Sequence, residues 1–349
     1  MNDQLLKIAI TADPELPVPP RLYGGIERII DLLACGLDQR GHDVTLFAHE
    51  KSESRVKVVP WTGKNSRSVF DVVSNARLLN RHIKEGSFDI VHSFSRLAIL
   101  APIMMTRIPK LMTYQRAISP ASVRWGRRLS GGSLCFSAIS RWMVQHVRQE
   151  AAWSIVPNGV ALSAYDFVPH VGDDAPLVFL GRIEPIKGPH LAIEIARRAN
   201  RKLVIAGNIP EEWQAWFDHV IRPLVDGEKI RYVGPVDDRQ KNMLLGSAVA
   251  LLMPILWDEP FGIVMAEAMA CGTPVLGLKR GAVPEVVEDG VTGFVRDDAE
   301  TLSDLVGKLG ALNRFSCRDR VAELYSADAV VSGYLNAYRS TIRRQQEID

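Results

Sequence analysis

The sequence predicts an α/β protein made of two doubly wound, Rossmann-like domains. Short apolar strands alternate with amphipathic helices along the chain, a pattern typical of parallel sheets covered by helices. The chain has 349 residues, enough for two such domains. Its 47% hydrophobic and 23% charged content excludes a disordered chain.

The composition also excludes several classes of protein. No apolar run reaches the roughly 18 residues that a membrane-spanning helix needs. The N-terminus enters a strand without a basic segment, so we expect no signal peptide and a cytoplasmic protein. The cysteines are scattered without a C-x-x-C pair, so we expect neither structural zinc nor a disulfide framework. They are Cys35, Cys135, Cys271 and Cys317.

The N-terminal half begins with a strand at 6–10, followed by a proline-rich loop at 14–20. A helix is predicted over 26–40, because its apolar residues recur on one face. Further strands are predicted at 44–48, 88–92 and 110–113.

Gly24 and Gly25 lie at the end of the loop that follows the first strand. Ligands of doubly wound sheets bind at the carboxyl ends of the strands, and glycines there let the backbone approach a ligand closely. The alternative is a tight turn with no ligand.

The C-terminal half begins after a Pro-Asn-Gly-Val element at 157–160, which reads as a crossover between domains. Apolar strands are predicted at 177–180, 202–206, 230–233, 249–253 and 275–277. The last predicted helix spans about 329–345.

Glu259 and Glu267 are separated by seven residues. On one helix they would sit about 80° apart and ~12 Å along the axis. If Glu259 precedes a helix that contains Glu267, the two carboxylates can hold different ends of one elongated ligand. The N–H groups of 261–263 would then open the helix, free to bind an anion. The alternative is a buried amphipathic helix whose acids cap its N-terminus.

Arg182 and Lys187 flank a turn directly after a hydrophobic strand that ends at Gly181. An arginine offers a planar fork to phosphate oxygens and a lysine a mobile point charge. Two cations at the end of a strand can neutralise a diphosphate and stabilise it as a leaving group. The alternative is a solvated surface loop.

These two elements and the Pro-Asn-Gly-Val segment resemble the retaining GT-B glycosyltransferases of family 4, also called glycosyl transferases group 1, in which the E-x7-E pair is the hallmark. The resemblance covers essentially the whole chain and is weakest over 50–85 and 115–150.

The resemblance implies the GT-B fold, with two Rossmann-like domains facing a cleft. An acceptor-side domain would span 1–157 and a nucleotide-sugar domain 158–330. A last helix within 331–349 would pack back on the first domain.

The activity that the resemblance implies is transfer of a hexosyl group from a UDP- or GDP-linked sugar to an acceptor hydroxyl, with retention of anomeric configuration. Such a reaction serves polysaccharide, glycolipid or small-glycoside biosynthesis. We expect no metal and no cofactor, because Arg182 and Lys187 supply fixed positive charge.

The resemblance also assigns roles to residues. Arg182 and Lys187 would hold the diphosphate, Glu259 the sugar hydroxyls, and Glu267 the ribose hydroxyls. The other donor-binding residues would be Gly24, Gly25, Phe261, Gly262 and Ile263.

The sequence departs from the family at Gln115. Many members carry a T-x-H element whose histidine lies near the sugar, and here Gln115 follows Thr113 at that spacing. A glutamine donates and accepts hydrogen bonds but carries no charge, so a role for an imidazole here is in doubt. His92 is another candidate, although a strand-end histidine with satisfied hydrogen bonds is the favoured reading.

Nine cations and no acid lie between 90 and 149, although the net charge of the chain is only +2. This local basic region favours an anionic or lipid-linked acceptor and a peripheral membrane contact. Within it, 120–129 carries Trp125 and Leu129 among arginines, as an interfacial segment does. The alternative is a solvated loop, and no nucleic-acid-binding module is evident.

Two rival functions stand beside the transferase. The first is a sugar phosphorylase or epimerase, because these enzymes use the same fold and sites. The second is a non-catalytic nucleotide-sugar-binding protein, against which the intact cations and carboxylates of the proposed donor site argue.

Overall fold

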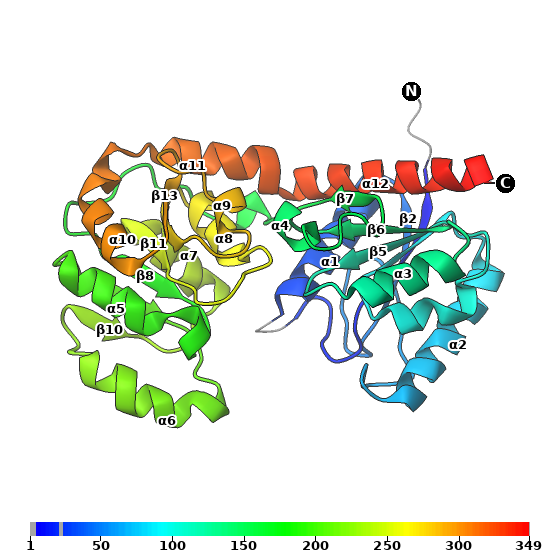
Figure 1. Cartoon of the computed structure of the whole chain (residues 1–349), viewed down its shortest axis with the longest axis horizontal. Helices are drawn as coiled ribbons and strands as arrows, with labels where there is room; N and C mark the ends of the chain where they lie inside the picture. Colours follow the sequence, from blue (N-terminus) through cyan, green and yellow to red (C-terminus); the bar gives the residue numbers. More distant parts are fainter. Residues whose placement is uncertain (1–4, 21–23, 349) are drawn as a thin grey trace. The chain divides into compact units, whose positions relative to one another are not determined.

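The computed structural model describes residues 5–20 and 24–348. The chain divides into two compact units (Figure 1). Unit 1 comprises 1–158 together with 327–349, and unit 2 comprises 159–326. Each unit is built around one parallel sheet, so the predicted fold class of two doubly wound α/β domains is confirmed.

The sheet of unit 1 has the strand order β3-β2-β1-β4-β5-β6-β7, with every pair parallel. The order reverses between β1 and β4, the position where ligands bind in doubly wound sheets. The strands are β1 (Lys7–Thr11), β2 (Asp43–Ala48), β3 (Lys57–Pro60), β4 (Ile90–Ser93), β5 (Lys110–Tyr114), β6 (Leu134–Ala138) and β7 (Trp153–Ile155).

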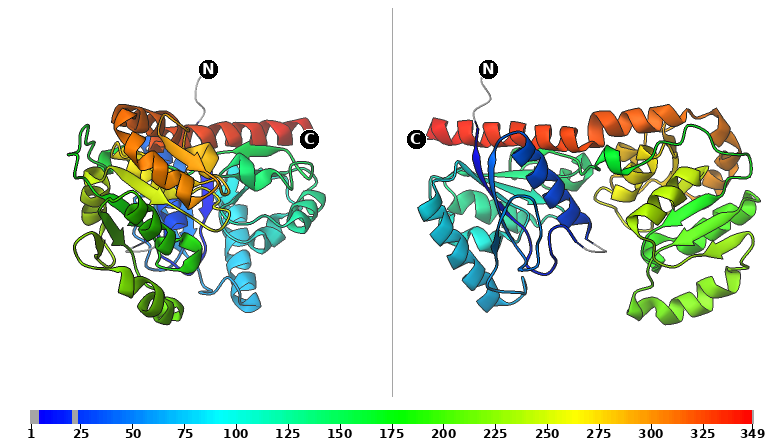
Figure 2. Two further views of the ribbon diagram at one scale, coloured as in Figure 1. Left: turned by 60° about the vertical axis from the view of Figure 1, so that its left-hand side comes forward. Right: turned by 180° about the vertical axis from the view of Figure 1, so that it is seen from behind.

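Helices cover both faces of this sheet. Figure 1 shows α3 over one face, and Figure 2, seen from behind, shows α1 over the other. The apolar stripe of α1, which includes Ile30, Leu33 and Leu37, packs into the core with Ile8 and Ile10 of β1. The helices are α1 (Gly25–Gln39), α2 (Val69–Gly86), the 3₁₀ helix η1 (Leu97–Ile103), α3 (Pro120–Leu129), α4 (Arg141–Val144) and α12 (Ala327–Ile348).

The C-terminal helix α12 completes the core of unit 1. It packs against α1, β5 and β6, and buries Tyr334 and Tyr338 completely. The Tyr338 hydroxyl lies 2.7 Å from Nδ1 of His92, whose Nε2 lies 2.6 Å from the Thr113 hydroxyl. Burial lowers the pKa of His92 to about 3. His92 is therefore a neutral core residue with both nitrogens occupied.

The sheet of unit 2 repeats the topology of the first, with the order β10-β9-β8-β11-β12-β13 and every pair parallel. The order reverses between β8 and β11. The strands are β8 (Leu177–Leu180), β9 (Leu203–Ala206), β10 (Ile230–Tyr232), β11 (Ala250–Met253), β12 (Val275–Leu278) and β13 (Gly293–Arg296). The α-helices are α5 (Pro189–Arg198), α6 (Gln214–Trp216), α7 (Asp238–Ser247), α8 (Ile263–Ala270), α9 (Val283–Val286), α10 (Ala299–Leu305) and α11 (Arg314–Arg320).

A buried arginine joins several segments of unit 2. Arg314, at the start of α11, donates to the carbonyls of Val168 at 2.7 Å, Ala248 at 2.9 Å and Gly246 at 3.0 Å. It also donates to the Thr273 hydroxyl at 2.8 Å. These partners are all neutral, and burial lowers the pKa of Arg314 below its usual value. This one side chain therefore satisfies three carbonyls and one hydroxyl from separate segments of unit 2.

Lys110 does not belong to the basic surface predicted for 90–149, because its side chain is fully buried. Its ammonium donates to the carbonyls of Thr106 and Ile108, at 2.8 and 2.7 Å, and to the Ser133 hydroxyl at 2.7 Å. Burial lowers the pKa of Lys110 to about 7. This cation thus fastens the loop before β5 to the loop before β6.

The stability of unit 1 should rise with pH between about 7 and 9.5, by at most about 1.4 kcal/mol per pH unit from Lys110. In this window the unfolded lysine keeps its proton while the folded one has lost it, so higher pH favours the folded state. Denaturant unfolding of wild type and Lys110→Met at several pH values tests this. The difference between the two proteins should change across the window, and a constant difference would contradict the assignment.

Candidate functional site

In unit 2, three loops meet at the carboxyl ends of neighbouring strands, where the strand order reverses. The loop after β8 carries Arg182 and Lys187, and the loop after β11 carries Glu259. The loop after β12 carries Gly281. The parallel topology therefore brings together residues that lie up to about 100 positions apart in the sequence.

Lys187 and Glu259 form a direct ion pair. Lys187 Nζ lies 2.8 Å from Glu259 Oε2, and the two side chains are only 19% and 13% exposed. The indole N–H of Trp257 donates to the same oxygen at 3.1 Å, and the ammonium lies 4.8 Å from the centroid of the indole ring. The carboxylate is thus held in one orientation at the edge of the sheet.

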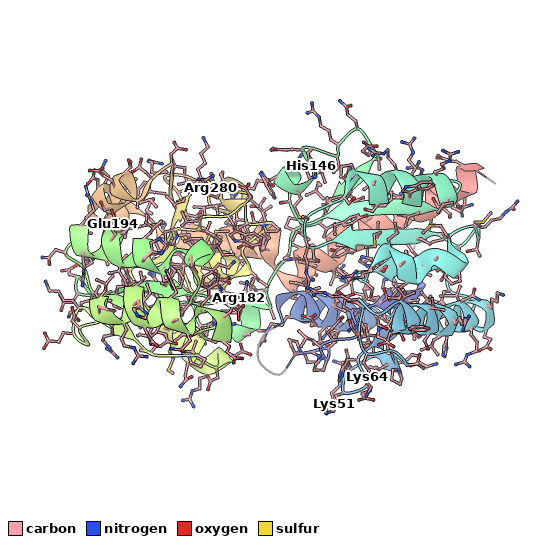
Figure 3. The ribbon with its side chains drawn as sticks, turned by 60° about the horizontal axis from the view of Figure 1, so that its bottom comes forward. Lys51, Lys64, His146, Arg182, Glu194 and Arg280 are labelled. Carbon is pink, nitrogen blue, oxygen red and sulfur yellow. The ribbon has the colours of Figure 1, made fainter. Side chains whose placement is uncertain are left out.

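Arg182 pairs with a different carboxylate. Its guanidinium lies 2.8 Å from Oε1 of Glu184, whose side chain is buried, while the Arg182 side chain is 37% exposed. Figure 3 labels Arg182 on unit 2. A guanidinium has five N–H donors and can contact several acceptors, phosphate oxygens among them.

Close backbone contacts fix the three loops to one another. Gly188 has a φ of +74°, and a Cβ there would lie 2.0 Å from the Pro254 carbonyl oxygen. A Cβ on Gly281 would lie 2.3 Å from the Glu259 carbonyl oxygen, which also accepts from Ala282 N–H at 2.8 Å. Only glycine fits at these two positions, so the loop that carries Pro254 and Glu259 lies in close backbone contact with both neighbouring loops.

Glu259 precedes helix α8 and Glu267 lies inside it, as the sequence predicted. Gly262 caps the helix with a φ of +76°, and Ile263 is its first residue. Of the three amides predicted to open the helix, only that of Ile263 therefore belongs to it. Phe261 lies before the cap with its side chain buried, because its ring packs on Tyr325.

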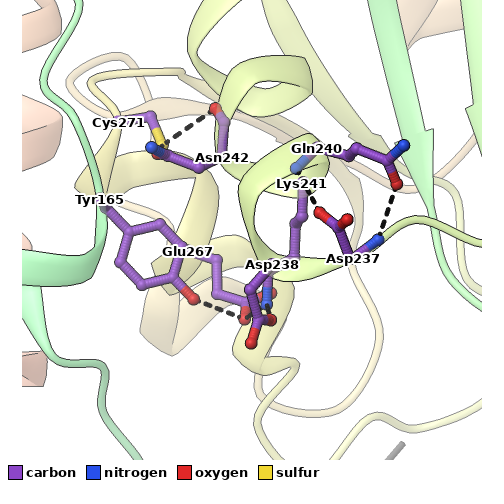
Figure 4. Close-up of polar contacts among 8 residues, drawn as sticks. All are labelled: Tyr165, Asp237, Asp238, Gln240, Lys241, Asn242, Glu267 and Cys271. Atoms are coloured by element: carbon purple, nitrogen blue, oxygen red, sulfur yellow. Dashed lines mark hydrogen bonds and ion pairs between the residues drawn. The ribbon is translucent and has the colours of Figure 1, made fainter. Parts of the chain in front are cut away.

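Glu267 is buried and holds two partners that the sequence analysis did not single out. The Tyr165 hydroxyl donates to its Oε1 at 2.8 Å, and Lys241 Nζ donates to the same oxygen at 2.6 Å (Figure 4). Neither partner lies in a motif, and no spacing in the sequence signals these contacts.

The remaining predicted site residues belong to unit 1. Gly24 caps α1 with a φ of +152°, and a Cβ there would lie 2.7 Å from Pro20 Cβ. A Cβ on Gly25 would meet nothing within 4 Å. Gln115 and Asn158 exchange two amide hydrogen bonds, of 2.9 and 2.8 Å. Gln115 therefore anchors the segment at which unit 1 ends.

Asp13, just after β1, is a further candidate that the sequence analysis missed. Its Oδ1 is buried without a hydrogen-bond partner in the described part of the chain. Burial, together with the nearby charge of Glu15 and Glu27, raises the pKa of Asp13 to about 6, against the opposing effect of Arg116 and Arg96. A carboxyl of this kind, beside the reversal of strand order, suits a hydrogen bond to a ligand hydroxyl.

Within residues 5–20 and 24–348, no three His, Cys, Asp or Glu side chains cluster closely enough to hold a metal ion. Nor does any helix there have the length and apolar character to cross a membrane.

Comparisons with known proteins agree with this architecture. Residues 23–164 match the family described as Glycosyltransferase Family 4, and residues 166–315 match the one described as Glycosyl transferases group 1. A phosphatidyl-myo-inositol mannosyltransferase of Mycobacterium leprae is 28% identical over 321 residues, covering 80% of this chain and 82% of that protein.

Two solved structures share the fold. AviGT4, a glycosyltransferase involved in avilamycin A biosynthesis, superposes with a TM-score of 0.74 at 24% identity, covering 97% of this chain and 98% of that one. The Anabaena protein HepE, in complex with UDP and glucose, superposes with a TM-score of 0.73 at 17% identity, covering 96% and 100%. With both halves matched and the fold shared, the chain belongs to the family 4 (group 1) glycosyltransferases of the GT-B type.

Proposed function

We propose that the protein transfers a hexosyl group from a UDP- or GDP-linked sugar to an acceptor hydroxyl, with retention of anomeric configuration and without a metal ion. The observation that carries this proposal is the contact between Lys187 and Glu259 at the strand-order reversal of unit 2. A cation for the phosphate and a carboxylate for the sugar lie there 2.8 Å apart.

In this proposal Arg182 and Lys187 hold the diphosphate. The Lys187 ammonium has three donors, so it can keep Glu259 and also bind a phosphate oxygen. Arg182 adds a second positive charge from the same loop. Fixed cations stabilise negative charge most effectively in a site that excludes water, which favours departure of the nucleotide.

Carboxylates bind the sugars at the two ends of the donor. Glu259, pinned by Lys187 and Trp257, accepts hydrogen bonds from hydroxyls of the transferred sugar. The N–H of Ile263, at the start of α8, donates a hydrogen bond to the nucleotide sugar, between the two carboxylates. Glu267 accepts from the ribose hydroxyls. Gly24 and Gly25 of unit 1 are the other proposed donor-binding residues, and Gln115 stands where many members of the family carry a histidine.

The chemical step in this proposal occurs on one face of the sugar. The bond from the anomeric carbon to the phosphate oxygen breaks as the bond to the acceptor oxygen forms on the same face. The acceptor proton passes to the departing phosphate oxygen, so the leaving group is also the base. Retention follows without an enzyme nucleophile, and the cations of Arg182 and Lys187 hold the departing diphosphate.

The acceptor in this proposal is anionic or lipid-linked, because cations of unit 1 lie on its surface. Arg124 and Arg127 contact Glu150 from α3, beside exposed Trp125. Lys51 and Lys64, which follow β2 and β3, are further exposed cations of unit 1 and are labelled in Figure 3. The Mycobacterium leprae relative is named for a phosphatidyl acceptor. The basic region 90–149 would then meet the inner membrane face from the cytoplasm.

A thermal-shift titration with UDP, GDP, ADP and TDP tests donor binding. A ligand at 100 times its Kd stabilises by about 2.7 kcal/mol, which raises Tm by several degrees. We expect a shift with one nucleotide and its loss in Arg182→Ala and Lys187→Ala. The absence of any shift in the wild type would contradict the proposal.

Product analysis then separates the competing functions. A glycoside formed from the matching nucleotide sugar supports transfer. A sugar phosphate made from a non-activated sugar indicates a phosphorylase, and free sugar alone indicates an epimerase-type reaction. Nucleotide binding without turnover indicates a non-catalytic binding protein.

A further inference from the structure

Among residues 5–20 and 24–348, the carboxylate of Glu267 is contacted through Oε1 alone. The Tyr165 hydroxyl at 2.8 Å and the Lys241 ammonium at 2.6 Å both donate to this oxygen (Figure 4). The side chain of Glu267 is 8% exposed and that of Lys241 is 13% exposed. Two donors on one oxygen fix the rotamer of the carboxylate and orient its second oxygen, Oε2.

Lys241 stays charged in this environment. Burial disfavours the ammonium, but Glu267 and Asp238 outweigh this effect, so the pKa of Lys241 lies above its usual value. Asp238 Oδ1 lies 3.1 Å from the ammonium. Lys241 therefore keeps its positive charge beside Glu267 at neutral pH.

The position of Lys241 is fixed from both sides along α7. Before it, Asp237 and Gln240 form a reciprocal capping box with hydrogen bonds of 2.8 and 3.0 Å. After it, the side-chain amide of Asn242 accepts from Asp166 N–H at 3.0 Å and donates to the Asp166 carboxylate at 2.7 Å. Because these hydrogen bonds order the first turns of α7, the backbone position of Lys241 relative to Glu267 is fixed.

We propose that Lys241 and Tyr165 are positioning residues that aim Oε2 of Glu267 at the ribose hydroxyls, and so make the protein select ribonucleoside over deoxyribonucleoside diphosphates. This inference rests on the proposed function, which gives Glu267 the ribose. A buried carboxylate that is oriented for two hydroxyls is left partly unpaired when one hydroxyl is missing, and a site built this way rejects the deoxy analogue.

A purely structural ion pair is the rival explanation, because Lys241 also connects α7 to α8. The two explanations differ in the nucleotide that is affected. Loss of a structural contact would weaken the binding of all nucleotides alike. Loss of the orientation of Oε2 would weaken only the binding of the nucleotide that carries the ribose 2′-hydroxyl.

Calorimetric titration with UDP and 2′-deoxy-UDP separates them, with the guanosine pair used instead if GDP is the nucleotide that binds. We expect the wild type to prefer the ribonucleotide by about tenfold or more. Lys241→Met should lose about tenfold in affinity for the ribonucleotide and much less for the deoxynucleotide. Lys241→Arg should restore most of the preference, because it keeps the charge.

The control is Lys202→Met, which removes the exposed ion pair with Asp174 in the same unit. If Lys241→Met does not fold, Tyr165→Phe carries the test, since it deletes one hydroxyl and should lower the preference for ribose. Equal weakening of both nucleotides, or an unchanged preference in Tyr165→Phe, would overturn the inference. If the wild type binds no nucleotide, the proposed function fails together with it.

Discussion

Glu259→Ala is expected to lower kcat by about 10²-fold or more while the protein remains folded. The wild-type carboxylate is fixed by Lys187 and Trp257, and its backbone carbonyl is braced by Ala282. The substitution removes an interaction with the reacting sugar but leaves the backbone contacts. Lys187 also loses its partner, so the ammonium is free to move away from the diphosphate. Both effects act on the chemical step more than on nucleotide binding.

Release of the nucleoside diphosphate from the nucleotide sugar, in the presence of an acceptor, measures this effect. Nucleotide Kd values measured in parallel should change much less than kcat, since Glu267 still holds the ribose and Arg182 the diphosphate in this proposal. Glu194→Ala, an exposed carboxylate of α5 labelled in Figure 3, is the matched control and should keep wild-type turnover. Wild-type turnover in Glu259→Ala would remove this residue from the reaction and leave the assignment of the site without its main support.

Arg314→Met is expected to lower the free energy of unfolding of unit 2 by about 3–5 kcal/mol. The guanidinium donates to the carbonyls of Val168, Gly246 and Ala248, all within 3.0 Å. A methionine has a similar apolar stem but no donor. Several buried acceptors would therefore lose their partners at once, and the polypeptide segments that Arg314 joins would be free to separate.

Denaturant unfolding monitored by tryptophan fluorescence and by circular dichroism measures this loss. Arg198→Met is the matched control, because Arg198 forms an exposed ion pair with Glu300, which is expected to contribute less than about 1 kcal/mol. A loss below about 1 kcal/mol in Arg314→Met would show that water or neighbouring groups replace the guanidinium.

The elements that the sequence predicted best are those buried on both faces. The strands β8, β11 and β12 are continuous apolar runs, and the structure has them within one residue of the predicted bounds. The placement of Glu259 before α8 was also predictable, because the glycine in between is a strong local signal.

Other elements had no clear signal. β3 and β7 are short outer strands of the first sheet. Together they contain one buried residue, and their sequences show no clear apolar run. β6 carries Cys135 and Ser137 among its apolar residues, which blurs the pattern. The partners of Glu267 could not be predicted from the sequence for another reason. Tyr165 and Lys241 lie 102 and 26 positions away, and their meeting depends on the packed sheet.

Unit 1 is assembled from both ends of the chain, and this has a consequence for synthesis on the ribosome. Residues 159–326 emerge as one continuous stretch, so unit 2 can fold while translation continues. The first sheet is made earlier but lacks Tyr334 and Tyr338, which belong to α12 and are synthesised only after unit 2. Until α12 is made, the apolar residues of unit 1 that pack against it stay uncovered, and Nδ1 of His92 lacks its contact with the Tyr338 hydroxyl. Unit 1 is therefore begun before unit 2 and completed after it.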